Sequence, residues 1–408
     1  WMQTDYGKKL RSLLSEGYIQ KIVDFGSLPV FGDADTYPAI FFIRKNKQKT
    51  LLYKKIGDLN HTSIVETKSK DIEISSLSEN AWSFDSFNLI EHLNERKIPF
   101  KNMEYYAKPL IGCLTGMDRV FVVTKETINT KQLDKELLYP YAYRGEEVSR
   151  FGKVEPKAYV IYPYKEGDNN SLDLIKEDEL NTRYPNTYKY LLDFKEELQQ
   201  RKDSRKFYAQ ENWYRHLRPG SIDYVRPEKI LFKGIDTIGK AGLLDKNSIF
   251  NGANCPGIIL VNNELNKLYL LGVLNSDLVT NYLNSICPKK LGGYFRYNSS
   301  NLAKIPIVKG SEEEVRELEN IVIKLTITEN EILNLKSKFH KRIQSSLGLE
   351  KVTKKLEEFY SLTFKEFLQE LEKQKIKLSL ADQDEWDEYF STYVSKIREY
   401  KIDNKTLN

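Results

Sequence analysis

Two windows of the sequence bring cationic, amide and aromatic side chains together within a few residues. The first covers residues 201–233, and the second covers residues 289–298, which read Lys-Lys-Leu-Gly-Gly-Tyr-Phe-Arg-Tyr-Asn. Lysine and arginine neutralise phosphates, side chains with paired donors or acceptors read base edges, and aromatic rings stack on a base taken out of a duplex. Both windows therefore indicate contact with nucleic acid. A solvated loop with half-buried tyrosines is the alternative that composition leaves open.

The glycine pair Gly292-Gly293 sets the second window apart, because glycine lets the backbone approach a partner closely. Trp213 in the first window could face DNA or a core, and a core position is the favoured interpretation. The side chains of these windows that we predict to bind DNA are Arg205, Lys206, Tyr214, Arg215, Arg218, Lys289, Lys290, Tyr294, Arg296, Tyr297 and Asn298.

Motifs for self-sufficient catalysis are missing from the sequence. A nucleotide phosphate cradle needs closely spaced glycines, yet no Gly-x-Gly occurs. No Gly-x-Ser-x-Gly elbow occurs, and the four histidines and three cysteines include no pair at zinc-ligand spacing. The acid-x-Lys sequence Glu155-Pro156-Lys157 matches a fragment of a metal-dependent nuclease site, with Glu146 and Glu147 as the nearest further acids. A turn leading into a strand is the favoured interpretation, so we predict no catalytic residue and no metal site here.

Composition sets wide limits on the class of protein. A chain of 408 residues exceeds ordinary single-domain size, so two or three packed units are expected. The net charge of +5 and the pI near 8.7 permit a nucleic-acid partner without requiring one. The three cysteines lie far apart, which favours a reducing compartment, and no run reaches the roughly 18 apolar residues of a membrane span. We therefore expect a cytoplasmic protein without a membrane partner. Its start at Trp1, without a signal-peptide pattern, suggests that it begins inside a longer polypeptide.

The hydrophobic pattern predicts three consecutive regions. Residues 1–104 read as α/β followed by a connector, residues 105–310 as a mixed, strand-rich α+β domain, and residues 311–408 as an α-helical segment with three apolar stripes. Two capping signals, Thr363-x-x-Glu366 and Ser379-x-x-Asp382, precede such stripes. The elements expected in the first two regions are helices at 6–17 (stopped by Gly17), 87–96, 184–201 and 267–284, buried strands at 19–25 and 39–44, and strands at 120–123, 158–162, 229–232 and 257–261.

A series of short motifs runs through nearly the whole chain in a fixed order. Each motif is weak alone, whereas their order is specific. The motifs are Trp1-Met-Gln-Thr-Asp-Tyr-Gly-Lys-Lys-Leu-Arg11, Ile22-Val-Asp-Phe-Gly26, Pro29-Val-Phe31, Tyr37-Pro-Ala-Ile40, Gly112-x-x-Thr-Gly-x-x-x-Val-Phe121, Arg144-Gly-Glu-Glu-Val148, Trp213-Tyr214, Pro227-Glu-Lys-Ile230, Leu274-Asn-Ser276, Gly292-Gly-Tyr-Phe-Arg-Tyr297, Ile305-Pro-Ile307, Phe364-Lys-Glu-Phe367 and Glu385-Trp386. In this order they resemble the C-terminal portion of adenine-N6 DNA methyltransferases that carry a TaqI-like target-recognition domain, especially type IIG restriction–modification enzymes.

The resemblance implies a role for each region. Residues 1–104 would be the distal part of a methyltransferase fold plus a connector, residues 105–310 the target-recognition domain, and residues 311–408 a helical extension. It also implies that Phe31 stacks on a flipped adenine, for which a core phenylalanine at a strand end is the alternative, and that Arg144 contacts DNA.

In the family that the chain resembles, the loop that binds S-adenosylmethionine and an Asn-Pro-Pro-Tyr catalytic motif precede the segment matching Trp1. This sequence contains no Asn-Pro dipeptide. The resemblance therefore implies a prokaryotic DNA-recognising chain that is inactive alone. Its partners would be double-stranded DNA and a catalytic methyltransferase half, in the same or a partner chain. The complete enzyme would use S-adenosylmethionine, and Mg²⁺ where it also cleaves. A non-catalytic specificity or scaffold subunit, whose helical tail binds a partner protein, is the other hypothesis.

Overall fold

The computed structural model describes residues 1–2, 5–26, 28–31, 37–60, 65–80, 82, 84, 89–168, 171–201, 212–221 and 225–407. Contacts divide the chain into two compact units. The first unit consists of Trp1–Val148 and Val154–Lys309, and the second of Ser149–Lys153 and Gly310–Asn408. The chain therefore enters the second unit for five residues, returns to the first, and enters the second again at Gly310.

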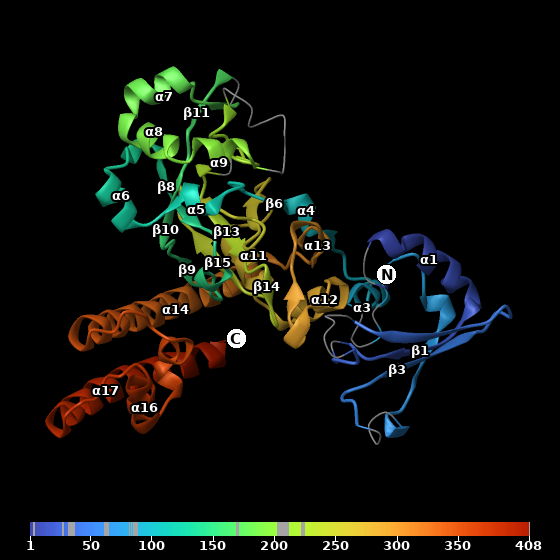
Figure 1. Cartoon of the computed structure of the whole chain (residues 1–408). Helices are drawn as coiled ribbons and strands as arrows, with labels where there is room; N and C mark the ends of the chain where they lie inside the picture. Colours follow the sequence, from blue (N-terminus) through green and yellow to red (C-terminus); the bar gives the residue numbers. More distant parts are fainter. Residues whose placement is uncertain are drawn as a thin grey trace. The chain divides into compact units, whose positions relative to one another are not determined.

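The N-terminal part of the first unit is a helix and a four-stranded sheet, drawn in blue in Figure 1. Helix α1, Lys8–Leu13, continues into a π-helical turn, Leu14–Tyr18, in which Gly17 adopts φ +108°. Only glycine takes this conformation without strain, so the prediction that Gly17 stops the helix is confirmed. The sheet has the order β2-β1-β3-β4, with β1 antiparallel to β2 and parallel to β3. Its strands are β1 Ile19–Asp24, β2 Ala39–Ile43, β3 Thr50–Lys55 and β4 Lys70–Glu73.

The two faces of this sheet differ in burial. On one face Ile22, Phe41 and Tyr53 share a register row and pack with the core of this part. On the other face the strand β2, which was expected to be buried, leaves Ile40 50% and Phe42 45% exposed. That expectation was wrong because β2 is an edge strand covered on a single face, so alternate side chains point outward.

The described residues of the expected target-recognition region form two larger sheets and three two-stranded ribbons, one of which includes β5 from before residue 105. The strands expected at 158–162, 229–232 and 257–261 are confirmed as β10, β13 and β17. The five-stranded sheet has the order β6 Ala107–Leu110, β17 Gly257–Leu260, β13 Lys229–Phe232, β15 Ala241–Leu244 and β9 Lys153–Val154. The four-stranded sheet has the order β16 Ile249–Phe250, β8 Leu138–Ala142, β10 Ala158–Ile161 and β7 Val122–Val123. The ribbons are β11 Tyr164–Glu166 with β12 Leu172–Leu174, β14 Ile235–Asp236 with β18 Phe295–Arg296, and β19 Pro306–Ile307 with β5 Lys101–Asn102.

Helices depart from the expected spans where side chains cap a turn. The strand expected at 120–123 begins as a helical turn, because the Thr115 hydroxyl accepts from Met117 N and donates to Asp118 just before it. The helix expected at 267–284 is two helices, since Ser276 caps the second one. The helices of the first unit after α1 are α3 Leu89–Glu95, α4 Met103–Tyr106, α5 Asp118–Phe121, α6 Lys125–Lys131, α7 Glu177–Arg183, α8 Pro185–Leu192, α9 Lys195–Gln199, α11 Lys267–Leu274, α12 Asp277–Ile286 and α13 Ser299–Leu302.

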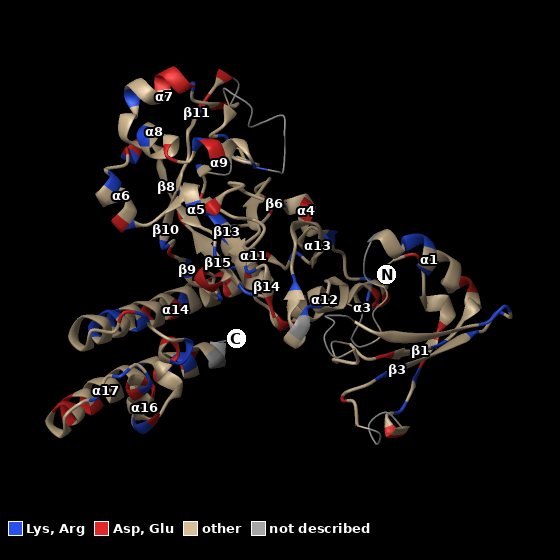
Figure 2. Cartoon of the chain, in the orientation of Figure 1, with Lys and Arg blue, Asp and Glu red and all other residues tan. Residues whose placement is uncertain are grey.

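The second unit is helical, as expected, and its two long helices α14 and α17 pack side by side (Figure 1). The expected capping box Thr363–Glu366 is present, and Ser379 and Asp382 exchange the same pair of bonds. The Phe339 ring lies at the centre of the core, 3.7 Å from the Phe359 ring centroid. Basic and acidic residues are interspersed along these helices (Figure 2). The helices are α14 Glu312–Leu347, α15 Lys354–Glu357, α16 Phe364–Lys373 and α17 Leu380–Leu407.

Two further observations concern the cysteines and the helices. Cys113, Cys255 and Cys287 are all free thiols and all buried. Among the residues that the structure describes, no helix combines the length and the apolar character needed to cross a membrane.

Candidate nucleic-acid interface

The window at residues 289–298 forms a narrow loop with a closed stem. Lys290 N donates to Tyr294 O at 2.7 Å, and Arg296 N donates to Pro288 O at 2.9 Å. The turn at the end of this loop needs Gly292 and Gly293, whose φ values are +72° and +79°. Lys290, Tyr294 and Arg296 are exposed, and Lys289 is half-buried. The stem therefore exposes cationic and aromatic side chains to solvent next to a turn that contains two glycines.

Two residues of this loop have structural roles. Tyr297 was predicted to contact DNA, but its ring is only 1% exposed, and its hydroxyl donates to Asn284 Oδ1 at 2.7 Å. The prediction for Tyr297 is therefore wrong, because a long-range partner holds the ring in the core. The Oδ1 of Asn298 accepts from Asn301 N at 2.9 Å and caps α13. That atom is thus committed to the fold.

The turn that follows β8 places Arg144 on the surface of the same domain. Its guanidinium lies 5.0 Å from the Tyr143 ring centroid, and its Nε donates to the Tyr143 hydroxyl at 2.8 Å. The next residue, Gly145, lies beside the alkyl chain of Lys233, since a Cβ built on it would be 3.5 Å from that chain. The Arg144 turn is therefore adjacent to Lys233, the residue that follows β13.

A buried carboxylate connects this turn with the 289–298 loop. Asp236 in β14 forms ion pairs with Lys233 at 2.7 Å and Lys240 at 3.0 Å, and it is the register partner of Phe295 in β18. Burial alone would raise the pKa of Asp236, but the two ammonium groups outweigh that effect and bring the pKa down to about 2. One ionised carboxylate thus holds two lysines, and the cluster keeps a net positive charge at neutral pH.

The sequence prediction missed Lys233 and Lys240 as members of this surface. The signal that could have found them is the spacing Lys233-x-x-Asp236-x-x-x-Lys240 between two short strands. We call the set Arg144, Lys233, Lys240, Lys289, Lys290, Tyr294 and Arg296 the basic surface.

The other window, at residues 201–233, is mostly structural where the structure describes it. Trp213 and Tyr214 are fully buried, so the core position favoured for Trp213 is confirmed, and the predicted DNA contact of Tyr214 is wrong. The Tyr214 hydroxyl donates to Ile175 O at 2.5 Å, which explains why the ring turns inward. Arg215 is half-buried and Arg218 is exposed. The predicted contacts Arg205 and Lys206 lie outside the described residues.

A buried arginine, Arg201, and a partly buried carboxylate, Glu177, hold that window in place. Arg201 donates to the carbonyl oxygens of Thr115, Trp213 and Arg215 at 2.8–3.1 Å. Glu177 Oε1 accepts from Trp213 Nε1 at 3.1 Å. Because buried polar groups are costly unless hydrogen-bonded, these contacts fix the backbone that precedes Arg218.

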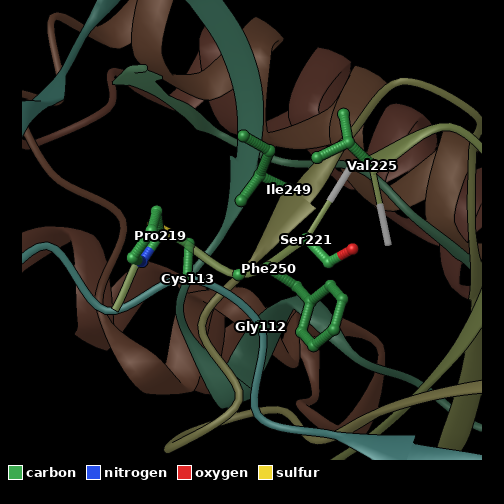
Figure 3. Close-up of a pocket in the computed structure, with 8 residues that line it drawn as sticks. Gly112, Cys113, Pro219, Ser221, Val225, Ile249 and Phe250 are labelled. Carbon is green, nitrogen blue, oxygen red and sulfur yellow. The ribbon is translucent and has the colours of Figure 1, made fainter. Parts of the chain in front are cut away.

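The buried pair Cys113 and His216 does not form a nucleophilic site. Cys113 Sγ lies 3.2 Å from His216 Nδ1, and His216 Nε2 lies 3.0 Å from Ile161 O. Burial lowers the pKa of His216 to about 3 and raises the pKa of the Cys113 thiol. The neutral imidazole donates a hydrogen bond from Nε2 to Ile161 O and accepts one at Nδ1 from the Cys113 thiol, so the sulfur stays protonated and inert. The cavity beside Cys113 (Figure 3) measures about 10 Å³, roughly the space of one water molecule.

The nuclease-like fragment around Lys157 is a turn, as the sequence interpretation favoured. The Glu147 carboxylate accepts from the backbone N–H groups of Tyr143, Arg144 and Lys157 at 3.0–3.2 Å. Those bonds occupy both oxygens, and the turn then enters β10. Within the described ranges, no group of three His, Cys, Asp or Glu side chains is placed to hold a metal ion.

Phe31 lies on the surface of the N-terminal part, 58% exposed, which excludes the core alternative. It follows the turn after β1, which Asp24 anchors by accepting from the Tyr53 hydroxyl and from Gly26 N, both at 2.8 Å. The ring therefore stands on a surface near an ordered strand end, where a base could reach it.

Family models match two parts of the chain. Residues 140–307 match the TaqI-like C-terminal specificity domain, and residues 311–408 match a model described as Domain of unknown function (DUF8810). The first match contains all members of the basic surface.

Two relatives are each 25% identical to the chain over the residues that align. The Escherichia coli protein "Type II restriction enzyme and methyltransferase RM.Eco57I" is 25% identical over 312 residues, which cover 69% of this chain and 31% of that protein. The Methanocaldococcus jannaschii protein "Type II methyltransferase M.MjaIV" is 25% identical over 231 residues, or 53% of this chain and 70% of that protein. The chain thus spans less than a third of the length of the E. coli relative.

A solved structure, that of the type IIG restriction endonuclease BpuSI, aligns over 78% of this chain and 40% of that one. Its TM-score of 0.39 and 10% identity are too low to establish a shared fold. The specificity-domain match and the two relatives confirm the resemblance that the motifs carried. Residues 140–307 are thus similar to the TaqI-like C-terminal specificity domain, and the chain is similar to proteins of type II restriction–modification systems.

Proposed function

We propose that this chain recognises a specific site in double-stranded DNA within an adenine-N6 methyltransferase of the type IIG restriction–modification class. The observation that carries the proposal is the basic surface. In the matched specificity domain the Arg144 turn lies beside Lys233, which is ion-paired with Asp236 of β14, and the 289–298 loop pairs with β14 through β18. Lysine and arginine at this surface would neutralise phosphates and fix the register, and Arg144 and Arg296 would read base edges.

The open face of the N-terminal sheet supports a catalytic partner half. Register pairs place Lys21, Val23, Ile40, Phe42, Leu52 and Lys54 on this face, opposite the covered one. Exposed aliphatic and aromatic side chains gathered on one face mark an interaction surface. We propose that the missing strands and helices of a methyltransferase fold cover this face, supplied by another segment of a longer chain or by a partner chain.

S-adenosylmethionine and Mg²⁺ would serve that catalytic half. The residues of this chain do not fit the cofactor: the sequence has no Gly-x-Gly loop. A groove of about 200 Å³ is lined mainly by apolar side chains and by the Glu228–Lys267 ion pair, which leaves no free carboxylate there for a ribose. Calorimetry should therefore detect no binding of S-adenosylmethionine to this chain, and micromolar affinity would contradict the assignment.

Charge reversal at the basic surface tests DNA recognition directly. Replacing Lys289, Lys290 and Arg296 by Glu should weaken binding to duplex DNA at every sequence. The slope of log affinity against log salt should fall in magnitude by about two to three, because each phosphate contact contributes roughly 0.9. The matched control reverses three exposed lysines of the helical unit, Lys351, Lys354 and Lys365, and changes the net charge equally. Equal slopes in the native chain and the Lys289/Lys290/Arg296 variant would refute the proposal.

A further inference from the structure

The segment between β8 and β10 is a loop with a closed neck. Glu147 closes it, since one carboxylate oxygen accepts from Tyr143 N and Arg144 N and the other accepts from Lys157 N. Both strands that flank the loop, β8 and β10, pair with each other in the four-stranded sheet. The neck, which includes the Arg144 turn, belongs to the first unit.

The tip of this loop belongs to the other unit. Residues Ser149–Lys153 cluster with the helices of Gly310–Asn408, and the backbone N–H of Lys153 donates to Asn330 Oδ1 of α14 at 2.7 Å. We call these five residues the tip. The side chain of Asn330, in the middle of α14, thus accepts the hydrogen bond from the backbone N–H at the start of β9.

Close packing accompanies that hydrogen bond. A Cβ added to Gly152 would collide with Ser149 Oγ and would lie 3.0 Å from Leu333 Cδ1 and 3.1 Å from Glu329 Cγ. Phe151 is 5% exposed and adopts φ +61°, a left-handed conformation that a bulky residue keeps only when its surroundings hold it. The fit between tip and helix is therefore specific in shape as well as in hydrogen bonding.

We propose that the helical unit of residues 311–408 is an intramolecular receptor for the tip, and that it positions the Arg144 turn for DNA recognition. The tip begins two residues after Glu147, the residue that fastens the Arg144 backbone. A loop whose neck and tip are both fastened has few conformations left, so Arg144 meets DNA with less ordering cost. Only the effect on DNA rests on the proposed function, whereas capture of the tip does not.

The capture is tested in the full chain with a site-specific protease site introduced between Lys309 and Glu312. After cleavage, the pieces should elute together in size-exclusion chromatography. Gly152→Val should separate them, because valine cannot fit against Leu333. Asn330→Ala should raise their dissociation constant about ten-fold, since the Lys153 N–H loses its acceptor.

The matched control is Asn334→Ala, which removes the same side chain from an exposed position one turn further along α14. Circular dichroism of each variant before cleavage checks that it folds, and Asn330→Ala decides the question if Gly152→Val does not fold. The proposal that the helical unit binds the tip would be overturned by either of two results. The pieces could still elute together in Gly152→Val, or the dissociation constants of Asn330→Ala and Asn334→Ala could be equal.

The effect on DNA is measured in the uncut chain. Asn330→Ala should weaken duplex binding three- to ten-fold, and the loss should disappear in a chain that already carries Arg144→Ala. If Asn330→Ala weakens association of the cleaved pieces but leaves DNA binding of the uncut chain unchanged, the positioning of Arg144 is overturned. Failure of the Lys289/Lys290/Arg296 reversal would instead refute the proposed function and with it the effect on DNA, while capture of the tip would stand.

Discussion

The N-terminal part and the target-recognition domain differ in how far they bury their apolar side chains. The sheet leaves Phe31, Ile40 and Phe42 about half exposed or more, while the domain encloses Trp213 and Phe232 completely. The domain instead exposes lysine and arginine at its basic surface. An apolar face left open by its own chain indicates a protein partner, whereas a closed core beneath a cationic surface indicates a polyanion. Under the proposed function, the two regions would therefore contact different partners.

The largest expected difference in stability concerns the closed core. Trp213→Ala should lower the free energy of unfolding by about 3–5 kcal/mol, because a fully buried ring leaves a cavity. Urea unfolding followed by circular dichroism measures the loss. Trp213→Phe, which keeps most of the volume, should cost clearly less. A loss below about 1 kcal/mol for the alanine variant would mean that the domain core is not closed there.

A buried lysine gives the same domain a pH-dependent stability. Lys229 is fully buried and donates to the carbonyl oxygens of Ser248 and Val225 at 2.8 and 3.3 Å, and burial lowers its pKa to about 8. Between about pH 8 and pH 10.5 the unfolded chain binds this proton and the folded chain does not, so folding stability rises with pH. The gain is at most about 3 kcal/mol, from roughly 1.4 kcal/mol per pKa unit.

Lys229→Met removes that titration while keeping a similar shape. The variant should be more stable than the native chain at pH 7, and their difference should narrow as pH rises toward 10.5. Unfolding curves at several pH values measure it. Parallel pH profiles for the two chains would show that Lys229 keeps an ordinary pKa.

Particular residues show what the sequence could and could not predict. The strand Lys229–Phe232 was predicted because a short apolar run between turn residues depends on local pattern alone. The inward turn of Tyr214 and Tyr297 escaped prediction, since each hydroxyl finds a partner far away in sequence, Ile175 O and Asn284 Oδ1. The basic surface was predicted in its 289–298 part. Its Lys233 and Lys240 members were missed, although both form ion pairs with Asp236 within four residues in sequence, because the spacing alone does not reveal that this turn lies beside the Arg144 turn and the 289–298 loop.

A smaller effect is expected on the open face of the N-terminal sheet. Changing Ile40 and Phe42 together to Ser should cost this chain no more than about 1 kcal/mol, because both are about half exposed. Association with the catalytic half should nevertheless weaken at least ten-fold, measured by titration of one half with the other. The control Phe41→Ser changes the covered face of the same strand and should cost more stability, since Phe41 packs against Trp1. Unaltered association of the double variant would exclude this face as the docking surface.

The smallest effect on stability, and the most specific effect on chemistry, concerns Phe31. Phe31→Ala should change the unfolding free energy by less than about 0.5 kcal/mol, since its ring is 58% exposed, whereas a core phenylalanine would lose about 3–5 kcal/mol. If Phe31 stacks on an extruded adenine in the complex with the catalytic half, a contact worth roughly 1–3 kcal/mol, Phe31→Ala should slow methylation about five- to a hundred-fold. Phe31→Trp should keep most of the rate, because a larger ring still offers a stacking face. A rate that falls equally in both variants would point to lost packing between the halves, and an unchanged rate in Phe31→Ala would exclude the stacking role.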